Sequence, residues 1–215
     1  MKPIQAKVSA RRTTAYRIGG VNAEQDVQGL TRDNRICGLT NGAFSLISLI
    51  RAVLNITGPA NVIVSTWSAG FYDAEQMNLL MSSGKVIDFK MILDRSFKTR
   101  KEGYSTHIED IFKPENIRTT NTHAKFVLIS NNDGWNICIR SSMNLNENKR
   151  CENYDIDNDP DVFNLFKQFS DDLFQKQAEG IIEEHRVINP VFCDLFNQPD
   201  DTDQYFQDTH KMIAF

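Results

Sequence analysis

Residues 122–156 read THAKFVLISNNDGWNICIRSSMNLNENKRCENYDI, and this stretch predicts three neighbouring strands. Residues 122–129 alternate between polar and apolar side chains, which is typical of a strand. Asn131–Gly134 predicts a hairpin turn, because Asn and the Asp-Gly pair tolerate positive φ. Residues 135–140 then form the returning strand of the hairpin. A polar loop follows, and residues 152–156 predict a third short strand.

Outside this stretch, apolar β-branched runs alternate with helical patterns. We expect strands over residues 35–40, 61–67, 86–93 and 117–120. We expect a first helix that begins at about residues 40–42 and ends at about 55, and further helices over 72–83 and 107–112. A helix of about 17 residues should begin at Asp159-Pro160, and a second helix should follow it through Arg186. The segment 96–104 is basic and predicts an exposed loop. Strands that alternate with helices predict the α/β class, as a sandwich with a mixed central sheet.

The buried side of the first helix is predicted from helical spacing. Its apolar stripe consists of Phe44, Ile47, Leu49, Ile50, Val53 and Leu54. A continuous β-branched run such as residues 61–67 indicates a strand that is covered on both faces.

Charge is distributed unevenly along the 215 residues, which have a net charge of −4. Residues 1–151 contain 20 Lys and Arg against 13 Asp and Glu, whereas residues 152–215 contain 4 against 15. This asymmetry permits an anionic ligand on the larger part and repels one from the tail. Two solvated surfaces of opposite sign are the alternative interpretation. We expect a basic N-terminal arm or weak edge strand over 1–33, one catalytic domain over 34–188 and an acidic tail over 189–215.

The sequence indicates a cytoplasmic protein with reduced cysteines that does not associate with a membrane. The N-terminus lacks the apolar core of a secretory signal, and the longest apolar run is too short to span a bilayer. The four cysteines are irregularly spaced, which argues against a disulfide framework or a zinc site. We expect Cys151 to be a buried packing residue. Trp67 and Trp135 are expected to pack in the core or hairpin, with stacking on a nucleic-acid base as the alternative.

Histidine is scarce, and His123 stands out because Lys125 follows two residues later. The period of a strand places these two side chains on one face. An imidazole beside an ammonium suits phosphate chemistry, because the lysine neutralises phosphate oxygens and favours the neutral, nucleophilic imidazole.

Polar residues at the next two strand ends complete the constellation. Ser142 and Asn144 are again two residues apart, and a hydroxyl and an amide can both donate to phosphoryl oxygens. Glu152 opens the third strand, where a carboxylate can fix the orientation of an imidazole. Taken separately, each of these residues has an ordinary alternative as a solvated loop or surface residue.

Together, His123-Ala-Lys125, Ser142-Met-Asn144 and Glu152-Asn153 resemble the motif of the phospholipase D superfamily. The amino-acid sequences of several segments are also similar to those of short prophage and mobile-element proteins of that superfamily. The resemblance implies the α/β/α sandwich fold of that superfamily, with a mixed sheet. It also implies that the protein acts as a phosphodiesterase, most naturally a nuclease. It implies that His123 forms a phosphohistidine, that Lys125, Ser142 and Asn144 hold the phosphate, and that Glu152 orients His123.

The resemblance implies no metal or other cofactor, and nucleic acid as the substrate. The superfamily uses two motif copies for each active site, and this chain has one. It therefore resembles the small bacterial endonucleases of the family, which implies a homodimer with the site across a two-fold axis.

Two positions depart from the motif: Ser130 stands where the pattern has Asp, and Ser141 where it has Gly. These departures motivate an alternative, a catalytically weak protein of the same fold that binds nucleic acid or a partner. A phospholipase is a lower alternative, since no amphipathic membrane helix is evident.

Overall fold

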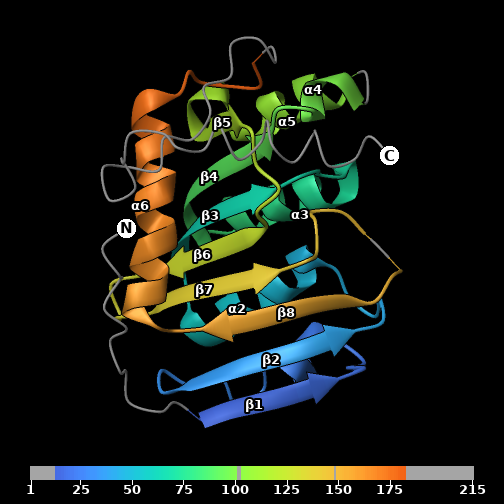
Figure 1. The fold of residues 1–215 in the computed structure, drawn as a ribbon, viewed down its shortest axis with the longest axis vertical. Coiled ribbons are helices and arrows are strands. Elements are labelled where there is room, and N and C mark those ends of the chain that lie inside the picture. The colour runs from blue at the N-terminus through green and yellow to red at the C-terminus, as the bar shows by residue number, and fades with distance from the viewer. Residues whose placement is uncertain (1–12, 101–102, 148, 183–215) are drawn as a thin grey trace, which may run out of the picture. The chain divides into compact units, whose positions relative to one another are not determined.

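The computed structural model describes residues 13–100, 103–147 and 149–182, which form one mixed eight-stranded sheet with helices on both faces (Figure 1). Across the sheet the strands are β1 (Thr13–Ile18), β2 (Asn34–Thr40), β8 (Glu152–Asp157), β7 (Asn136–Ser141), β6 (Phe126–Ser130), β3 (Ala60–Thr66), β4 (Val86–Asp94) and β5 (Ile117–Thr120). The pairs β1–β2, β3–β4 and β4–β5 are parallel, and the others are antiparallel. The predicted α/β class with a mixed sheet is confirmed.

Helices cover the two faces of the sheet unequally. One face packs against α1 (Ala23–Asp26), α2 (Leu46–Thr57), α3 (Phe71–Ser82) and α5 (Tyr104–Phe112), which with the sheet form the larger core. On the other face, α6 (Pro160–Lys176) lies across β6 and β7 over a smaller core (Figure 1). Short helical turns complete the list: α4 (Phe97–Arg100) and the 3₁₀ turn η1 (Pro114–Asn116).

Several predicted elements are confirmed closely. The hairpin turn has Gly134 at φ 87°, in the left-handed region that glycine tolerates. The predicted stripe of α2 is buried in full. Helix α6 has the expected length, and the Asp159 carboxylate caps it by accepting from Asp161 N–H at 2.9 Å. No helix among the described residues is long and apolar enough to cross a membrane.

Other boundaries were predicted wrongly. Helix α2 begins at Leu46 after Ser45, because Thr40 still pairs in β2 and its hydroxyl accepts Ala43 N–H at 3.2 Å to form the turn. The segment expected as an exposed loop over 96–104 contains α4, whose Phe97 is buried. Residues 177–182 are not helical, and the rest of the helix expected through Arg186 lies outside the described residues.

The start of β6 also differs, and this difference bears on the site. The strand begins at Phe126, four residues later than predicted. Ahead of Phe126, hydrogen bonds with side chains of neighbouring strands take the place of strand-to-strand backbone hydrogen bonds. Thr122 N–H donates to Asp94 Oδ2 at 3.2 Å, and Ser65 Oγ donates to the Ala124 carbonyl at 2.9 Å. The backbone ahead of β6 is therefore held in place without strand pairing.

The described part of the expected N-terminal arm belongs to the sheet. Residues 13–18 form the edge strand β1, parallel to β2, and α1 follows. A buried hydrogen bond from the Tyr154 hydroxyl to the Asp26 carboxylate fastens α1 to β8. The weak edge strand was thus the better of the two interpretations for residues 13–18. Residues 1–12 and the predicted acidic tail over 189–215 lie outside the described residues.

Candidate active site

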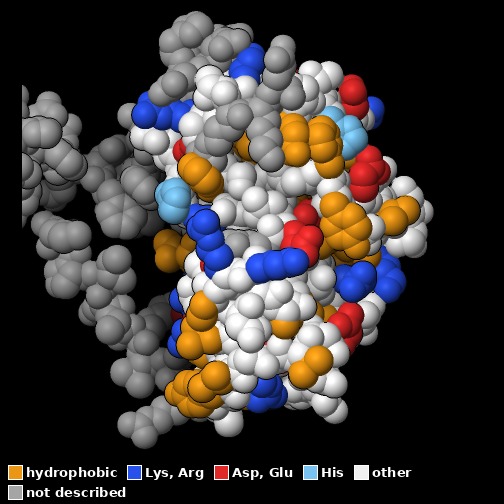
Figure 2. Space-filling model, turned by 90° about the vertical axis from the view of Figure 1, so that its right-hand side faces the viewer, with side chains coloured by type: hydrophobic (Ala, Val, Ile, Leu, Met, Phe, Trp, Pro, Cys, Tyr) orange, Lys and Arg blue, Asp and Glu red, His pale blue; other side chains and the backbone are white. Residues whose placement is uncertain are grey.

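Four strands bring their polar ends to one edge of the sheet. The carboxyl ends of β3 and β7 meet the amino ends of β6 and β8, because these neighbours are antiparallel. Pairing of Ser65 with Phe126, and of Ser141 with Tyr154, fixes this register. Figure 2 shows the side of the molecule that lies on the right in Figure 1. On this face, Lys and Arg side chains lie beside acidic and histidine side chains. The sequence prediction that three strand ends share one edge therefore agrees with the topology.

His123 and Lys125 lie together just ahead of β6, as their spacing predicts. Lys125 Nζ is 3.2 Å from His123 Nδ1 and 3.2 Å from the His123 carbonyl oxygen. His123 is exposed to solvent, and Lys125 is half-buried. The Trp67 ring also lies against the imidazole, with 5.7 Å between ring centroids. An approaching ligand can therefore reach a histidine that is flanked by an ammonium and an indole.

Lys125 lies between two carboxylates of the same edge. Burial lowers the pKa of Lys125, and the negative charges of Glu152 and Asp94 act in the opposite direction. Asp94 comes from the end of β4 and Glu152 from the start of β8. The ammonium is thus partly desolvated, which strengthens its attraction for an anion at this position.

Ser142 and Glu152 form a directly bonded pair across β7 and β8. The Ser142 hydroxyl donates to the Glu152 carboxylate, and Ser142 Oγ also accepts a hydrogen bond from Asn153 N–H at 3.0 Å. Glu152 thereby fixes the rotamer of Ser142. Its expected role of orienting His123 stays a prediction.

Asn144 lies in the loop that follows β7, opposite the end of β3. Its side-chain oxygen is 3.5 Å from Thr66 Oγ1. The neighbouring Leu145 N–H donates to Thr66 Oγ1 at 3.0 Å and to the Ser68 carbonyl at 3.1 Å. The loop therefore runs alongside the residues after β3, and Asn144 is held at the same edge as Ser142.

The two departures from the motif have distinct places in the structure. Ser130 ends β6 and pairs with Asn136 at the opposite end of the strand from His123. Five residues of strand put Ser130 about 13 Å beyond Phe126. Ser141 Oγ donates to the Asn153 carbonyl at 2.6 Å and accepts Met143 N–H at 3.0 Å. The Ser130 hydroxyl thus lies away from the site, and the Ser141 hydroxyl is bonded to the backbone of β8 and the loop.

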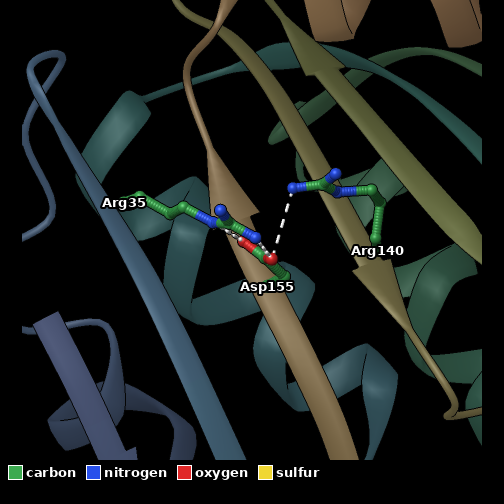
Figure 3. A network of polar contacts seen from close by, with 3 residues as sticks. All are labelled: Arg35, Arg140 and Asp155. Atoms are coloured by element: carbon green, nitrogen blue, oxygen red, sulfur yellow. Dashed lines mark hydrogen bonds and ion pairs between the residues drawn. The ribbon is translucent and has the colours of Figure 1, made fainter. Parts of the chain in front are cut away.

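An ionic network beside the site was not found by sequence reasoning. The Asp155 carboxylate lies between Arg35 and Arg140, which come from β2 and β7 (Figure 3). Arg140 Nη2 is 3.2 Å from Asp155 Oδ2. Asp157, two residues further along β8, pairs with Arg35 in the ladder, so the two arginines lie among two carboxylates. Only the strand register could have revealed this cluster, because its members lie far apart in the sequence.

The expectations for the aromatic residues and Cys151 have mixed outcomes. Trp135 packs at the edge of the larger core beneath the Arg32 guanidinium, which agrees with hairpin packing. Trp67 is half-buried, and its ring lies against the His123 imidazole. Cys151 is exposed, so the prediction of a buried packing residue was wrong. It occupies the loop before β8, outside the ladder that buries Cys138.

The described residues contain no group of three or more His, Cys, Asp or Glu side chains that could hold a metal ion.

Comparison with known proteins addresses the fold. No family model matches the sequence, and a search of curated proteins finds no match. Among solved structures, polyphosphate kinase from Porphyromonas gingivalis matches with a TM-score of 0.50 and 12% identity over 70% of this chain and 28% of that chain. The phospholipase D family member Nuc from Salmonella typhimurium matches with a TM-score of 0.44 and 15% identity, over 67% of this chain and 96% of that chain. The chain is similar in fold to these two solved structures.

A third solved structure is also similar. NucT from Helicobacter pylori matches with a TM-score of 0.45 and 15% identity, over 67% of this chain and 99% of that chain. At such identities a structural likeness establishes the fold alone. The mixed sheet with helices on both faces agrees with the sandwich that the motif implied, and the chemistry has to be argued from the site.

Proposed function

We propose that this protein is a metal-independent phosphodiesterase, a nuclease that works through a phosphohistidine intermediate. The observation that carries the proposal is the exposed His123 imidazole with the Lys125 ammonium 3.2 Å from its ring nitrogen. Asn144, at the same edge, supplies an amide for the phosphate oxygens, and the Ser142 hydroxyl, which donates to Glu152 in the structure, supplies a second donor when it turns to the phosphate.

In the first step, a ring nitrogen of His123 attacks phosphorus and forms a P–N bond, while the P–O bond to the leaving group breaks. The leaving oxygen takes a proton from a second imidazole. Lys125, Ser142 and Asn144 stabilise the charge on the non-bridging oxygens. In the second step, water attacks phosphorus, the P–N bond breaks, and the proton of water returns to the second imidazole.

The second imidazole is His123 of another copy, so the proposed enzyme is a homodimer. An exposed apolar patch beside the site supports this arrangement. Tyr16 is 75%, Ile18 85% and Leu39 45% exposed, and strand register places them on the sheet face opposite α2. Leu39 pairs with Asn153, the residue after Glu152. A two-fold contact through this patch would bring two copies of the site edge together.

The positions of Ser130 and Ser141 favour catalysis over a purely binding role. Ser130 lies at the far end of β6, so the replacement of the motif Asp by Ser does not change the groups that lie beside His123 or Lys125. Ser141 directs its hydroxyl to the β8 backbone. The five candidate residues are therefore present at one edge despite both departures.

The test is cleavage of a nucleic acid and of a chromogenic phosphodiester in EDTA, with His123→Gln as the variant. Glutamine retains the polarity of this exposed side chain but not its nucleophilic ring. We expect EDTA-resistant cleavage that is lost in the variant, and a protein–phosphate adduct that is acid-labile and appears only in wild type. Equal cleavage by the variant would refute the assignment.

A further inference from the structure

His123 lies in the connection between β5 and β6, and this connection crosses the ends of two other strands. In the sheet, β4 and β3 lie between β5 and β6. Strand pairing stops at Thr120 and resumes at Phe126. Three strand spacings amount to about 14 Å, and a chain of six residues spans at most about 20–22 Å. Residues 121–125 therefore have to pass directly over the carboxyl ends of β4 and β3.

Asp94, the last residue of β4, holds the backbone just before His123. Thr122 N–H donates to Asp94 Oδ2 at 3.2 Å. The other carboxylate oxygen, Oδ1, accepts Ser96 N–H at 3.0 Å and also the Ser96 hydroxyl. Asp94 is only 7% exposed, and hydrogen bonds to an ionised acceptor are stronger than those between neutral groups. The Asp94 carboxylate is therefore a firm anchor for Thr122.

A second side chain holds the backbone just after His123. Ser65 Oγ, in β3, donates to the Ala124 carbonyl at 2.9 Å, and Ser65 is fully buried. Thr122 Oγ1 also accepts Ala124 N–H at 3.1 Å, which closes a local turn around His123. The residues on both sides of His123 are thus fixed by side chains from the two strands that the connection crosses.

The position of this backbone decides where the imidazole lies. His123 is exposed, so its ring depends on the backbone for its position more than a buried side chain does. Lys125 Nζ is 3.2 Å from the His123 carbonyl oxygen as well as from the ring, so the ammonium follows the same backbone. Asn144 is held by separate contacts in the loop after β7. A shift of residues 122–124 would therefore move the ring and the ammonium relative to Asn144.

We propose that Asp94 and Ser65 are positioning residues that hold residues 122–124 so that His123 faces the phosphate. This inference rests on the proposed function. Asp94 acts through Thr122 N–H, Ser65 acts through the Ala124 carbonyl, and neither touches the reacting atoms. Active-site groups have to be held within about 0.5 Å of the productive geometry. In a connection outside the strand ladder, these side-chain hydrogen bonds supply that precision.

The variants separate positioning from an effect of charge. Asp94 also acts on Lys125 electrostatically, because its negative charge opposes the lowering of the Lys125 pKa by burial. Asp94→Ala removes both the charge and the hydrogen bonds. Asp94→Asn removes the charge but keeps an oxygen that can accept Thr122 N–H. Ser65→Ala removes the hydrogen bond to the Ala124 carbonyl without changing any charge.

Ser96→Ala is the matched control. It removes a hydroxyl that donates to Asp94 Oδ1, while Oδ2 keeps its bond to Thr122 N–H. Thermal unfolding is measured for every variant, so that activities are compared only at temperatures where the protein is folded.

The first readout is hydrogen exchange of Ala124 N–H, measured by NMR. The acceptor of this N–H is Thr122 Oγ1, which every variant retains, so faster exchange reports movement of the segment and not loss of the bond partner. We expect faster exchange in Asp94→Ala and Ser65→Ala, and near wild-type exchange in Asp94→Asn and Ser96→Ala.

The second readout is kcat and KM for bis(p-nitrophenyl) phosphate. Displacement of positioned groups by about 1 Å can lower rates about 100-fold. We therefore expect kcat to fall at least about tenfold in Asp94→Ala and at least about threefold in Ser65→Ala. KM should change less, because the contacts of Asn144 are separate. Asp94→Asn should recover most of the loss, and Ser96→Ala should be close to wild type.

For either residue, unchanged Ala124 exchange in its alanine variant would overturn its positioning role, and so would faster exchange with unchanged kcat. Equal kcat losses in Asp94→Ala and Asp94→Asn would assign the effect to charge and overturn the role of Asp94. If Asp94→Ala does not fold, Asp94→Asn and Ser65→Ala still decide. Wild type that cleaves no phosphodiester would refute the proposed function, and Ala124 exchange would then still show whether the two side chains hold this segment.

Discussion

Gly38→Ala tests how the first two strands are joined to the rest of the sheet. A Cβ atom at position 38 would overlap the ring and hydroxyl of Tyr154, which is 1% exposed and donates to Asp26. The ring must move, because Gly38 is paired with Tyr154 in the β2–β8 ladder. That movement separates the Tyr154 hydroxyl from the Asp26 carboxylate, which is itself buried.

Two contributions determine the size of the effect. Overpacking a core costs about 1–3 kcal/mol. Leaving a buried polar group without its partner costs about 1–3 kcal/mol more. The free energy of unfolding should therefore fall by about 2–6 kcal/mol, and for a domain of this size each kcal/mol lowers Tm by about 2–4 °C.

The assay is urea and thermal unfolding followed by circular dichroism. Gly29→Ala is the matched control, because it places a Cβ in open space and meets only the strain of φ 83°. That strain is about 1–2 kcal/mol. A loss in Gly38→Ala no larger than in the control would refute the account of this junction.

The remaining predictions concern the site, its dimer and its cysteines. Lys125→Gln should lower kcat for a chromogenic phosphodiester about 100-fold or more while Tm stays close to wild type, because it removes a charge that stabilises the transition state; unchanged kcat would argue against phosphate binding by Lys125. The double variant Ile18→Asp, Leu39→Asp should be monomeric in sedimentation and inactive, whereas a dimer of wild-type stability would place the interface elsewhere. Cys151 is exposed and should react with a disulfide reagent at pH 8, whereas burial raises the pKa of Cys138 to about 12 and should keep it unreactive until the protein unfolds; mass mapping of the labelled peptides checks both. Ser130→Asp should leave cleavage unchanged, because position 130 lies at the end of β6 away from His123, and a large gain in rate would contradict that placement.

The parts of the fold that follow from local patterns could be predicted from the sequence. Helix α6 and the 131–134 turn carry their own start and stop signals, such as Asp159-Pro160 and Asp133-Gly134. The candidate residues could be grouped because His123 and Lys125 are two residues apart, although they lie ahead of the strand rather than in it, and the hairpin brings Ser142 near them.

The features that sequence reasoning missed depend on tertiary contacts. Phe97 turns a basic segment into a helix because it is buried in the core, which composition does not reveal. Asp155 and Asp73 resemble ordinary surface acids in the sequence. Their places appear only when strand register brings two arginines to Asp155 and when α3 buries Asp73.

The most direct test of the central claim is single-turnover cleavage of single- and double-stranded DNA and of a chromogenic phosphodiester in EDTA, by wild type and His123→Ala. Both proteins are first shown to have the same circular dichroism spectrum and Tm. The account predicts EDTA-resistant cleavage by wild type, an acid-labile phosphate adduct on the peptide that contains His123, and neither in the variant. Cleavage by His123→Ala at the wild-type rate, or no cleavage by folded wild type, would contradict it.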